Sequence, residues 1–115
     1  MKNKITFNEF LEIEKKLEIR IGTVTEAIRV PKSDKLLQLT VSFGEKIGTK
    51  ICVTNLGQHD EPSEFLDCTM PFVMNLEPSK MMGIESEVMI MVGEDDYVGI
   101  VGYNMKDYII GSKLL

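Results

Sequence analysis

The sequence predicts an all-β fold, a closed barrel of five strands with short helices at the N-terminus and between strands three and four. Apolar and polar residues alternate with period two in several stretches, as in half-buried strands. One short helical signal separates the third stretch from the fourth, and the strand–helix rhythm of a parallel sheet is absent. Since 115 residues suffice for one core, we expect residues 1–115 to form a single domain.

The N-terminal helix is predicted from a capping pattern. Thr6 and Glu9 have the spacing of a capping box, so a helix should begin near Phe7. Phe7, Phe10 and Leu11 share one face of that helix. This face either plugs the end of the barrel or packs on a second subunit, and the sequence leaves both alternatives open.

The first three strands follow from alternation and turn residues. Strand one spans Leu17–Val30, with Gly22 interrupting the pattern, which predicts a β-bulge near that glycine. A turn at Pro31–Lys35 leads to strand two, Leu37–Phe43, and a hairpin leads to strand three, Thr49–Thr54. The outward residues of strand two are polar and suit a ligand surface: Gln38, Thr40 and Ser42.

The second half contains a helical turn and two more strands. Pro62–Leu66 can form the turn, because proline is favoured at a helix start. Strand four spans Cys68–Asn75, where Pro71 predicts an edge position or a bulge. A loop at Leu76–Glu85 precedes strand five, Ser86–Val92.

The loop after strand four has the features of a binding platform. Pro78 fixes its own φ, and Gly83 is the natural place for a positive φ. The loop therefore holds out one cation, Lys80, between polar residues at the two strand ends, Asn75 and Ser86. No nucleophile with a neighbouring base is present.

A family resemblance starts from the same loop. The run Asn75-Leu76-x-Pro78-x-Lys80-x-x-Gly83-x-x-Ser86-Glu87 resembles the motif of the tRNA-binding domain family, whose members are oligonucleotide/oligosaccharide-binding (OB) barrels. Phe43-Gly44-x-x-Ile47-Gly48-x-Lys50 and Ser86-Glu87-Val88 resemble the CsaA subfamily, stand-alone members described as export-related chaperones. The resemblance covers nearly all of the chain.

The resemblance implies a nucleic-acid site. It places Lys80 and Ser86 on the RNA-facing side, and Asn75 corresponds to the strand-four asparagine of the family. OB barrels bind through strands two and three and the loops between strands one and two and strands four and five. We therefore expect six residues at the site, the alternative being ordinary solvated surface groups: Lys32, Lys35, Lys50, Asn75, Lys80 and Ser86.

Net charge restricts how nucleic acid could bind. The chain carries −5 overall, with six basic and three acidic groups in residues 19–50 and three basic and eleven acidic groups in residues 51–115. Positive charge is therefore concentrated in the first half and at Lys80. Any phosphate contacts should be local, weak and strongly salt-sensitive.

Methionine is frequent, with eight residues in the chain. Met89 or Met91 is expected to fill the core, but a flexible thioether can also line an adaptable groove for peptides. We expect Met74, Met81 and Met82 to form such a groove or a dimer seam, because Met81 and Met82 fall in a loop.

The sequence lacks the patterns that several classes of protein require. Cys52, Cys68 and His59 have no metal-ligand spacing, so neither a metal nor another cofactor is expected. Nucleotide-binding and hydrolase motifs are absent, which predicts a non-catalytic protein. Two cysteines, no apolar run of 18 residues and no signal peptide predict a cytoplasmic protein without a membrane span.

Two functions from different classes remain. One is tRNA binding by shape and backbone, and the other is a CsaA-like chaperone that binds unfolded or exported polypeptides. Three apolar parts of the chain lie outside the five strands: the residues before residue 17 and the extended segments Val98–Tyr103 and Tyr108–Leu115. Exposed apolar surface of this extent usually marks an interface, which predicts a homodimer.

Overall fold

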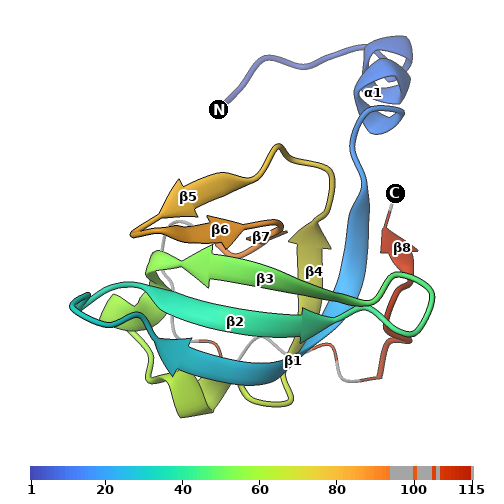
Figure 1. Cartoon of the computed structure of the whole chain (residues 1–115). Helices are drawn as coiled ribbons and strands as arrows, with labels where there is room; N and C mark the ends of the chain where they lie inside the picture. The colour runs from blue at the N-terminus through green and yellow to red at the C-terminus, as the bar shows by residue number, and fades with distance from the viewer. Residues whose placement is uncertain (94–99, 101–104, 106, 115) are drawn as a thin grey trace.

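Five strands wrap into a small barrel in the computed structural model, which describes residues 1–93, 100, 105 and 107–114 (Figure 1). Neighbouring strands in the sheet follow the order β3-β2-β1-β4-β7, and all pairs are antiparallel. The predicted all-β barrel is confirmed. The strands that form it are β1 (Ile19–Arg29), β2 (Leu37–Ser42), β3 (Thr49–Thr54), β4 (Thr69–Val73) and β7 (Met89–Ile90).

The barrel closes between β3 and the segment that precedes β7. The Glu87 N–H donates to the Ile51 carbonyl at 2.8 Å, and the Ile51 N–H donates to Glu87 Oε2 at 3.2 Å. The Val53 N–H donates to the hydroxyl of buried Ser86 at 2.9 Å. These bonds satisfy the free edge of β3, which would otherwise expose unpaired backbone groups.

A close approach in the core explains Gly22. A Cβ at this position would lie 2.5 Å from the Phe43 ring and 2.7 Å from the Val41 side chain. Phe43 in turn packs edge-to-face on Phe72, with ring centroids 5.5 Å apart. The predicted irregularity in β1 is present, but it lies beyond Gly22, where the register with β2 shifts between Val24 and Glu26.

Pro71 lies in an interior strand, so the prediction of an edge or a bulge is wrong. β4 has β1 on one side and β7 on the other, and its pairing with β1 is regular. Ile21 lies opposite Pro71 but makes its backbone hydrogen bonds elsewhere. Its N–H donates to the Ser112 carbonyl at 2.9 Å, and its carbonyl accepts from the Gly111 N–H at 2.7 Å. The missing N–H of Pro71 therefore leaves no group of Ile21 without a hydrogen bond, and the Pro71 carbonyl accepts from the Met91 N–H at 3.1 Å.

The predicted loop after strand four is a hairpin in its own right. β5 (Ser79–Met81) pairs with β6 (Ile84–Ser86), and Met82 and Gly83 form the turn with φ of 51° and 82°. The predicted fifth strand is accordingly divided between β6 and β7. The expected positive φ at Gly83 is confirmed.

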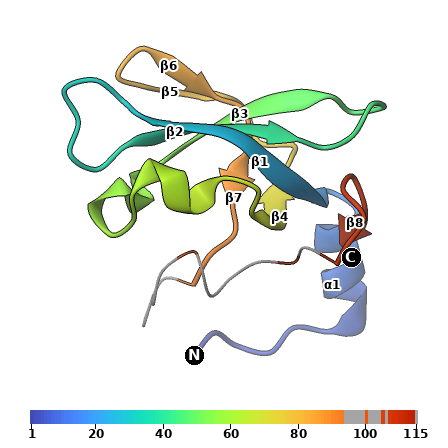
Figure 2. The ribbon, with the colours of Figure 1, turned by 90° about the horizontal axis from the view of Figure 1, so that it is seen from below.

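The N-terminal helix stands away from the barrel. α1 (Phe7–Glu14) begins with the predicted capping box, in which Thr6 and Glu9 exchange backbone-to-side-chain bonds of 3.1 Å. None of its residues is buried, and the ribbon views place it outside the barrel, at the same end of the molecule as β8 (Lys113–Leu114) (Figures 1 and 2). The alternative in which α1 plugs the barrel is therefore wrong.

Two 3₁₀ turns join β3 to β4, as predicted for the Pro62 region. η1 spans Asn55–Gln58, and η2 spans Pro62–Phe65 with proline at its start and Phe65 fully buried. The segment Val98–Tyr103 lies outside the described residues except for buried Ile100. No helix of the described part is long and apolar enough to cross a membrane.

Candidate nucleic-acid interface

A groove runs along the outside of the barrel where β3 faces the β5–β6 hairpin and β7. It consists of three adjoining hollows of about 110, 330 and 600 Å³. Val53, Met81 and Met89 line the first two, and Asn55, Leu56 and Met89 line the second and third. We call this continuous feature the β3 groove, since residues of β3 and of the turn after it form its floor.

The β3 groove adjoins the surface through which OB barrels bind their ligands. Gln38, Thr40 and Ser42 of β2 are half-buried and alternate with fully buried neighbours, so they face outward as predicted. Their partners on β3 are Val53, Ile51 and Thr49. This outer face of β2 and β3 is polar on β2 and partly apolar on β3, and none of these six residues is a cation, so cations would reach a ligand on it from the neighbouring loops.

The loop that carries Lys32 and Lys35 is held against η1. The Gly57 N–H donates to the Lys35 carbonyl at 2.8 Å, and Arg29 Nη1 donates to the carbonyls of Asp34 and Gly57 at 3.0 and 2.9 Å. Both lysine side chains are exposed, and Lys32 has a φ of 66°. The structure therefore fixes the backbone of one predicted cation, Lys35, next to η1, and Lys32 lies three residues earlier in the same loop.

Lys50 and Lys80 are placed differently. Lys50 pairs with buried Val41, so it shares the inward side of β3 near the barrel end and not the polar outer face. Lys80 is exposed on β5 directly opposite Glu85, while its neighbours Ser79 and Met81 line the groove. Because side chains alternate along a strand, Lys80 and Glu85 project from the other side of the hairpin.

Asn75 and Ser86 each make hydrogen bonds to the backbone. The Asn75 amide accepts from the Glu18 N–H at 2.8 Å and donates to the Lys16 carbonyl at 2.6 Å, which ties β4 to the start of β1. The Ser86 hydroxyl bonds β3 and also donates to the Val88 carbonyl at 3.2 Å. Both residues thus shape the ends of the hairpin, and their contact with nucleic acid stays a prediction.

The predicted methionine cluster is dispersed. Met81 lines the groove, Met82 is exposed at the hairpin turn, and Met74 packs against the core. Met89, which the sequence favours as core, is 51% exposed and lines all three hollows of the groove, so that expectation is wrong for Met89. The fully buried methionine is Met70.

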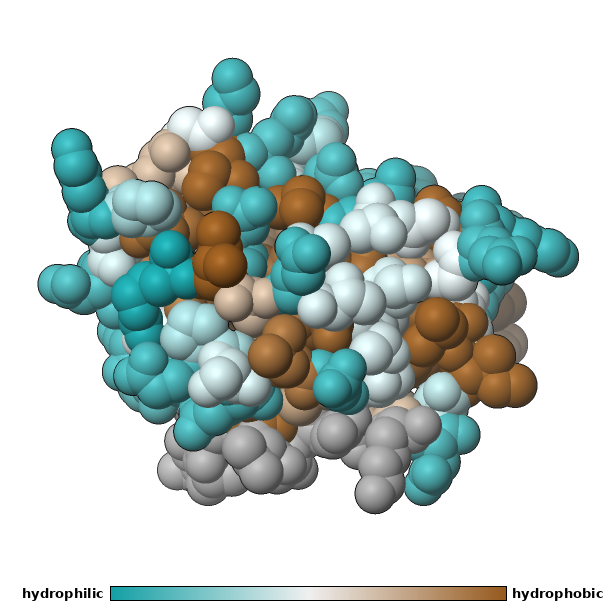
Figure 3. Space-filling view, turned by 60° about the horizontal axis from the view of Figure 1, so that its bottom comes forward, coloured by the Kyte–Doolittle hydropathy of each residue, from teal (hydrophilic) through white to brown (hydrophobic). Residues whose placement is uncertain are grey.

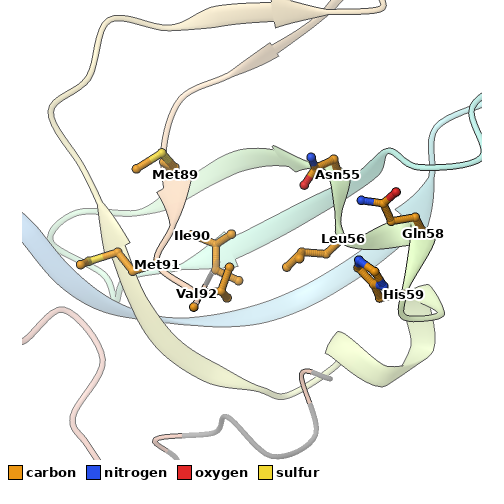
Figure 4. Close-up of a pocket in the computed structure, with 9 residues that line it drawn as sticks. Asn55, Leu56, Gln58, His59, Met89, Ile90, Met91 and Val92 are labelled. Atoms are coloured by element: carbon orange, nitrogen blue, oxygen red, sulfur yellow. The ribbon is translucent and has the colours of Figure 1, made fainter. Parts of the chain in front are cut away.

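The polar end of the groove was missed in the sequence analysis. Asn55, Gln58 and His59 line the largest hollow with Met89 and Met91 (Figure 4). Their local signal is a run of hydrogen-bonding side chains directly after strand three, in a position where a turn would expose them. Among the described residues, no cluster of three or more His, Cys, Asp or Glu could hold a metal ion.

Most of the chain matches the model of a known protein family. Residues 19–112 match the model of the family described as "Putative tRNA binding domain". The chain belongs to the tRNA-binding domain family. The predicted resemblance to it is confirmed, and the match includes every strand of the barrel and all of the β3 groove.

Curated relatives of this tRNA-binding domain include methionine–tRNA ligases. The ligase of Porphyromonas gingivalis is 43% identical over 91 residues, which cover 79% of this chain and 12% of the ligase. That of Methanococcoides burtonii is 40% identical over 94 residues, covering 82% of this chain and 13% of the ligase. The chain thus spans about an eighth of the length of these relatives.

Solved structures with this fold match the tRNA-binding domain over nearly its whole length. A MetRS-related protein from Pyrococcus horikoshii has a TM-score of 0.82 at 24% identity, with 99% of this chain and 100% of that one covered. The chaperone CsaA from Bacillus anthracis has a TM-score of 0.74 at 25% identity, with 98% and 100% covered. The OB-type barrel is therefore shared by all three.

Proposed function

We propose that this chain is a non-catalytic tRNA-binding protein of the CsaA type that acts as a stand-alone module in the cytoplasm. It recognises folded tRNA by its shape and by contacts to the RNA backbone, through the outer face of β2 and β3 and the loops beside it. The observation that carries this proposal is the fixed backbone of Lys35 next to η1 and the β3 groove. The likeness to the chaperone CsaA, at 25% identity and a TM-score of 0.74, supports the CsaA-type part of the proposal.

The charge distribution sets the expected mode of binding. A net charge of −5 disfavours a generic grip on any polyanion. Exposed cations at Lys32, Lys35 and Lys80 allow a few phosphate contacts, so affinity should be modest and depend steeply on salt. Recognition of folded RNA then comes from shape, with phosphates fixing the register.

The first experiment is an electrophoretic shift assay with bulk tRNA, with duplex DNA of equal charge as competitor. The proposal predicts a tRNA complex that duplex DNA does not displace at equal phosphate concentration. Displacement by both polyanions in proportion to their phosphate would contradict shape recognition. Absence of any complex at low salt would contradict tRNA binding itself.

The apolar part of the groove supports a second candidate function. Met81 and Met89 line the hollows beside β3, and thioether side chains adapt to varied apolar partners. A chaperone that binds unfolded or exported polypeptide there, as the name of the CsaA neighbour suggests, would use the same surface. Competition between tRNA and an unfolded polypeptide substrate would show whether one surface serves both.

A homodimer is part of the same proposal. Phe7 on α1 is 71% exposed, and Tyr108 and Ile109 near the C-terminal end are 53% and 80% exposed. Figures 1 and 2 draw α1 and β8, which follows Tyr108 and Ile109 in the chain, toward the same right-hand end of the molecule. Elsewhere, the face seen in Figure 3 shows apolar residues interspersed with polar ones. A two-fold interface on the α1 side would bury the exposed residues of both copies.

A further inference from the structure

The largest hollow of the β3 groove has two unlike walls. Leu56 points from η1 toward Ile90 and Val92, and Met89 stands at the end nearest the hairpin (Figure 4). Asn55 and Gln58 bring carboxamides to the η1 side, and both residues are exposed. At about 600 Å³ the hollow falls within the usual range of small-ligand pockets. We call it the η1 pocket.

The η1 pocket suits an uncharged planar heterocycle. No Asp, Glu, Lys or Arg is among its described lining residues, and besides His59 none of them has a side chain that can carry charge, so the pocket is a poor site for a buried phosphate or charged side chain. Leu56, Met89 and Val92 supply apolar contact for the face of a ring. Each carboxamide presents both a donor and an acceptor, which is the pairing that the edge of a nucleobase requires.

The cation Lys35 lies next to η1, and the neighbouring Arg29 is paired with Glu61, with Nη2 and Oε2 3.5 Å apart. Gly57, between two lining residues, donates its N–H to the Lys35 carbonyl at 2.8 Å, and Arg29 bonds the Gly57 carbonyl at 2.9 Å. The exposed Lys35 side chain therefore leaves the backbone next to the η1 side of the pocket. A base in the pocket would have its own phosphate within the reach of this loop.

We propose that the η1 pocket binds one unpaired, unstacked base of the RNA, with Asn55 and Gln58 contacting its edge. This inference rests on the proposed tRNA-binding function and adds one base contact to recognition by shape. A polypeptide side chain is the competing occupant. The paired amides and the adjacent Lys35 favour the nucleotide, because an apolar side chain would leave both carboxamides without new partners.

The direct test is NMR of the full chain with ¹³C-labelled methionine methyl groups. Uncharged nucleosides are titrated against inorganic phosphate and an uncharged apolar peptide, with the Met89 signal assigned through Met89→Leu. We expect at least one nucleoside to shift Met89 saturably, while phosphate does not. Asn55→Ala/Gln58→Ala should abolish the shift, and Asn8→Ala, an exposed asparagine on α1, should leave it intact.

A second readout separates a base contact from a charge contact. Asn55→Ala/Gln58→Ala should weaken tRNA binding roughly five- to tenfold with an unchanged salt slope, because no phosphate contact is lost. Lack of a Met89 shift with every nucleoside, or a shift with the peptide alone, would overturn the base pocket. If wild-type protein binds no tRNA, the proposed function fails, while the nucleoside titration still decides the pocket.

Discussion

The Ser86 hydroxyl accepts the backbone N–H of Val53 at 2.9 Å, and this bond joins the hairpin to the free edge of β3. Ser86→Ala removes the acceptor and leaves a buried N–H unpaired, so it should lower the free energy of unfolding by about 1–3 kcal/mol. Urea denaturation followed by circular dichroism measures this. Ser79→Ala, at the exposed cross-strand position, is the matched control and should change stability by less than about 0.5 kcal/mol. Equal effects of the two would contradict the role of Ser86 in closing the barrel.

Cys52 should react with a thiol reagent more slowly than a free thiol does. Burial raises the pKa of the Cys52 thiol to about 12, with a smaller opposing effect from a backbone bond at Ile90. Iodoacetamide reacts with the thiolate, so Cys52 should stay unmodified at pH 8.5 in the native protein and react once it is unfolded. Mass spectrometry of the labelled peptides measures both states, and fast native labelling would contradict the packing around β3.

Cys52 also predicts how stability depends on pH. The unfolded thiol loses its proton near pH 9, whereas the folded thiol keeps it until about pH 12. Above pH 9 the unfolded state binds fewer protons, so the Cys52 contribution to stability is complete below pH 9 and is lost as pH rises toward 12. Cys52→Ala should show a shallower decline of stability over this range in urea titrations. An unchanged slope would contradict the assignment to Cys52.

Glu85 should limit what Lys80 adds to RNA binding. The two residues face each other across the hairpin, so a phosphate near Lys80 also lies near a carboxylate. Glu85→Gln should therefore strengthen tRNA binding several-fold at low salt, and Lys80→Ala should weaken it for all tRNAs alike, with a slope flatter by about one contact. Neutral results for both substitutions would show that this side of the hairpin faces away from the RNA.

Ile109 tests the proposed dimer. At 80% exposure it is the most exposed isoleucine among the described residues, and a charge there would oppose an apolar interface. Light scattering after size exclusion should give a dimer mass for wild type and a monomer mass for Ile109→Glu. Ile28→Glu is the matched control, because Ile28 is 54% exposed on β1, outside the α1 side, and it should stay dimeric. A monomeric wild-type protein at micromolar concentration would refute the dimer.

Signals from neighbouring residues in the sequence were sufficient to predict most strands of the barrel. Alternation predicts β2 and β3 to within a residue, and the capping box of Thr6 and Glu9 predicts the start of α1. These features depend on neighbouring residues, which a sequence shows directly. The family motif from Asn75 to Glu87 then places the hairpin next to the strands through which OB barrels bind.

Long-range contacts explain the wrong predictions. Gly22 leaves room for the side chains of Phe43 and Val41, which come close to it only after β1 and β2 pair. Pro71 is tolerated inside the sheet because Ile21 bonds to the distant residues 111 and 112. Alternation alone could not show that Met89 would face the groove, because the chain leaves the barrel at the hairpin before it re-enters at β7.

The salt dependence of tRNA affinity for Lys35→Ala tests the proposed function most directly. The account predicts that wild-type affinity falls steeply with salt and that the substitution flattens the slope by about one phosphate contact. Lys4→Ala, an exposed lysine in the N-terminal segment, should leave affinity and slope unchanged. Identical affinities and slopes for wild type and Lys35→Ala would contradict the account, since the loop fixed on Gly57 would then make no contact with tRNA.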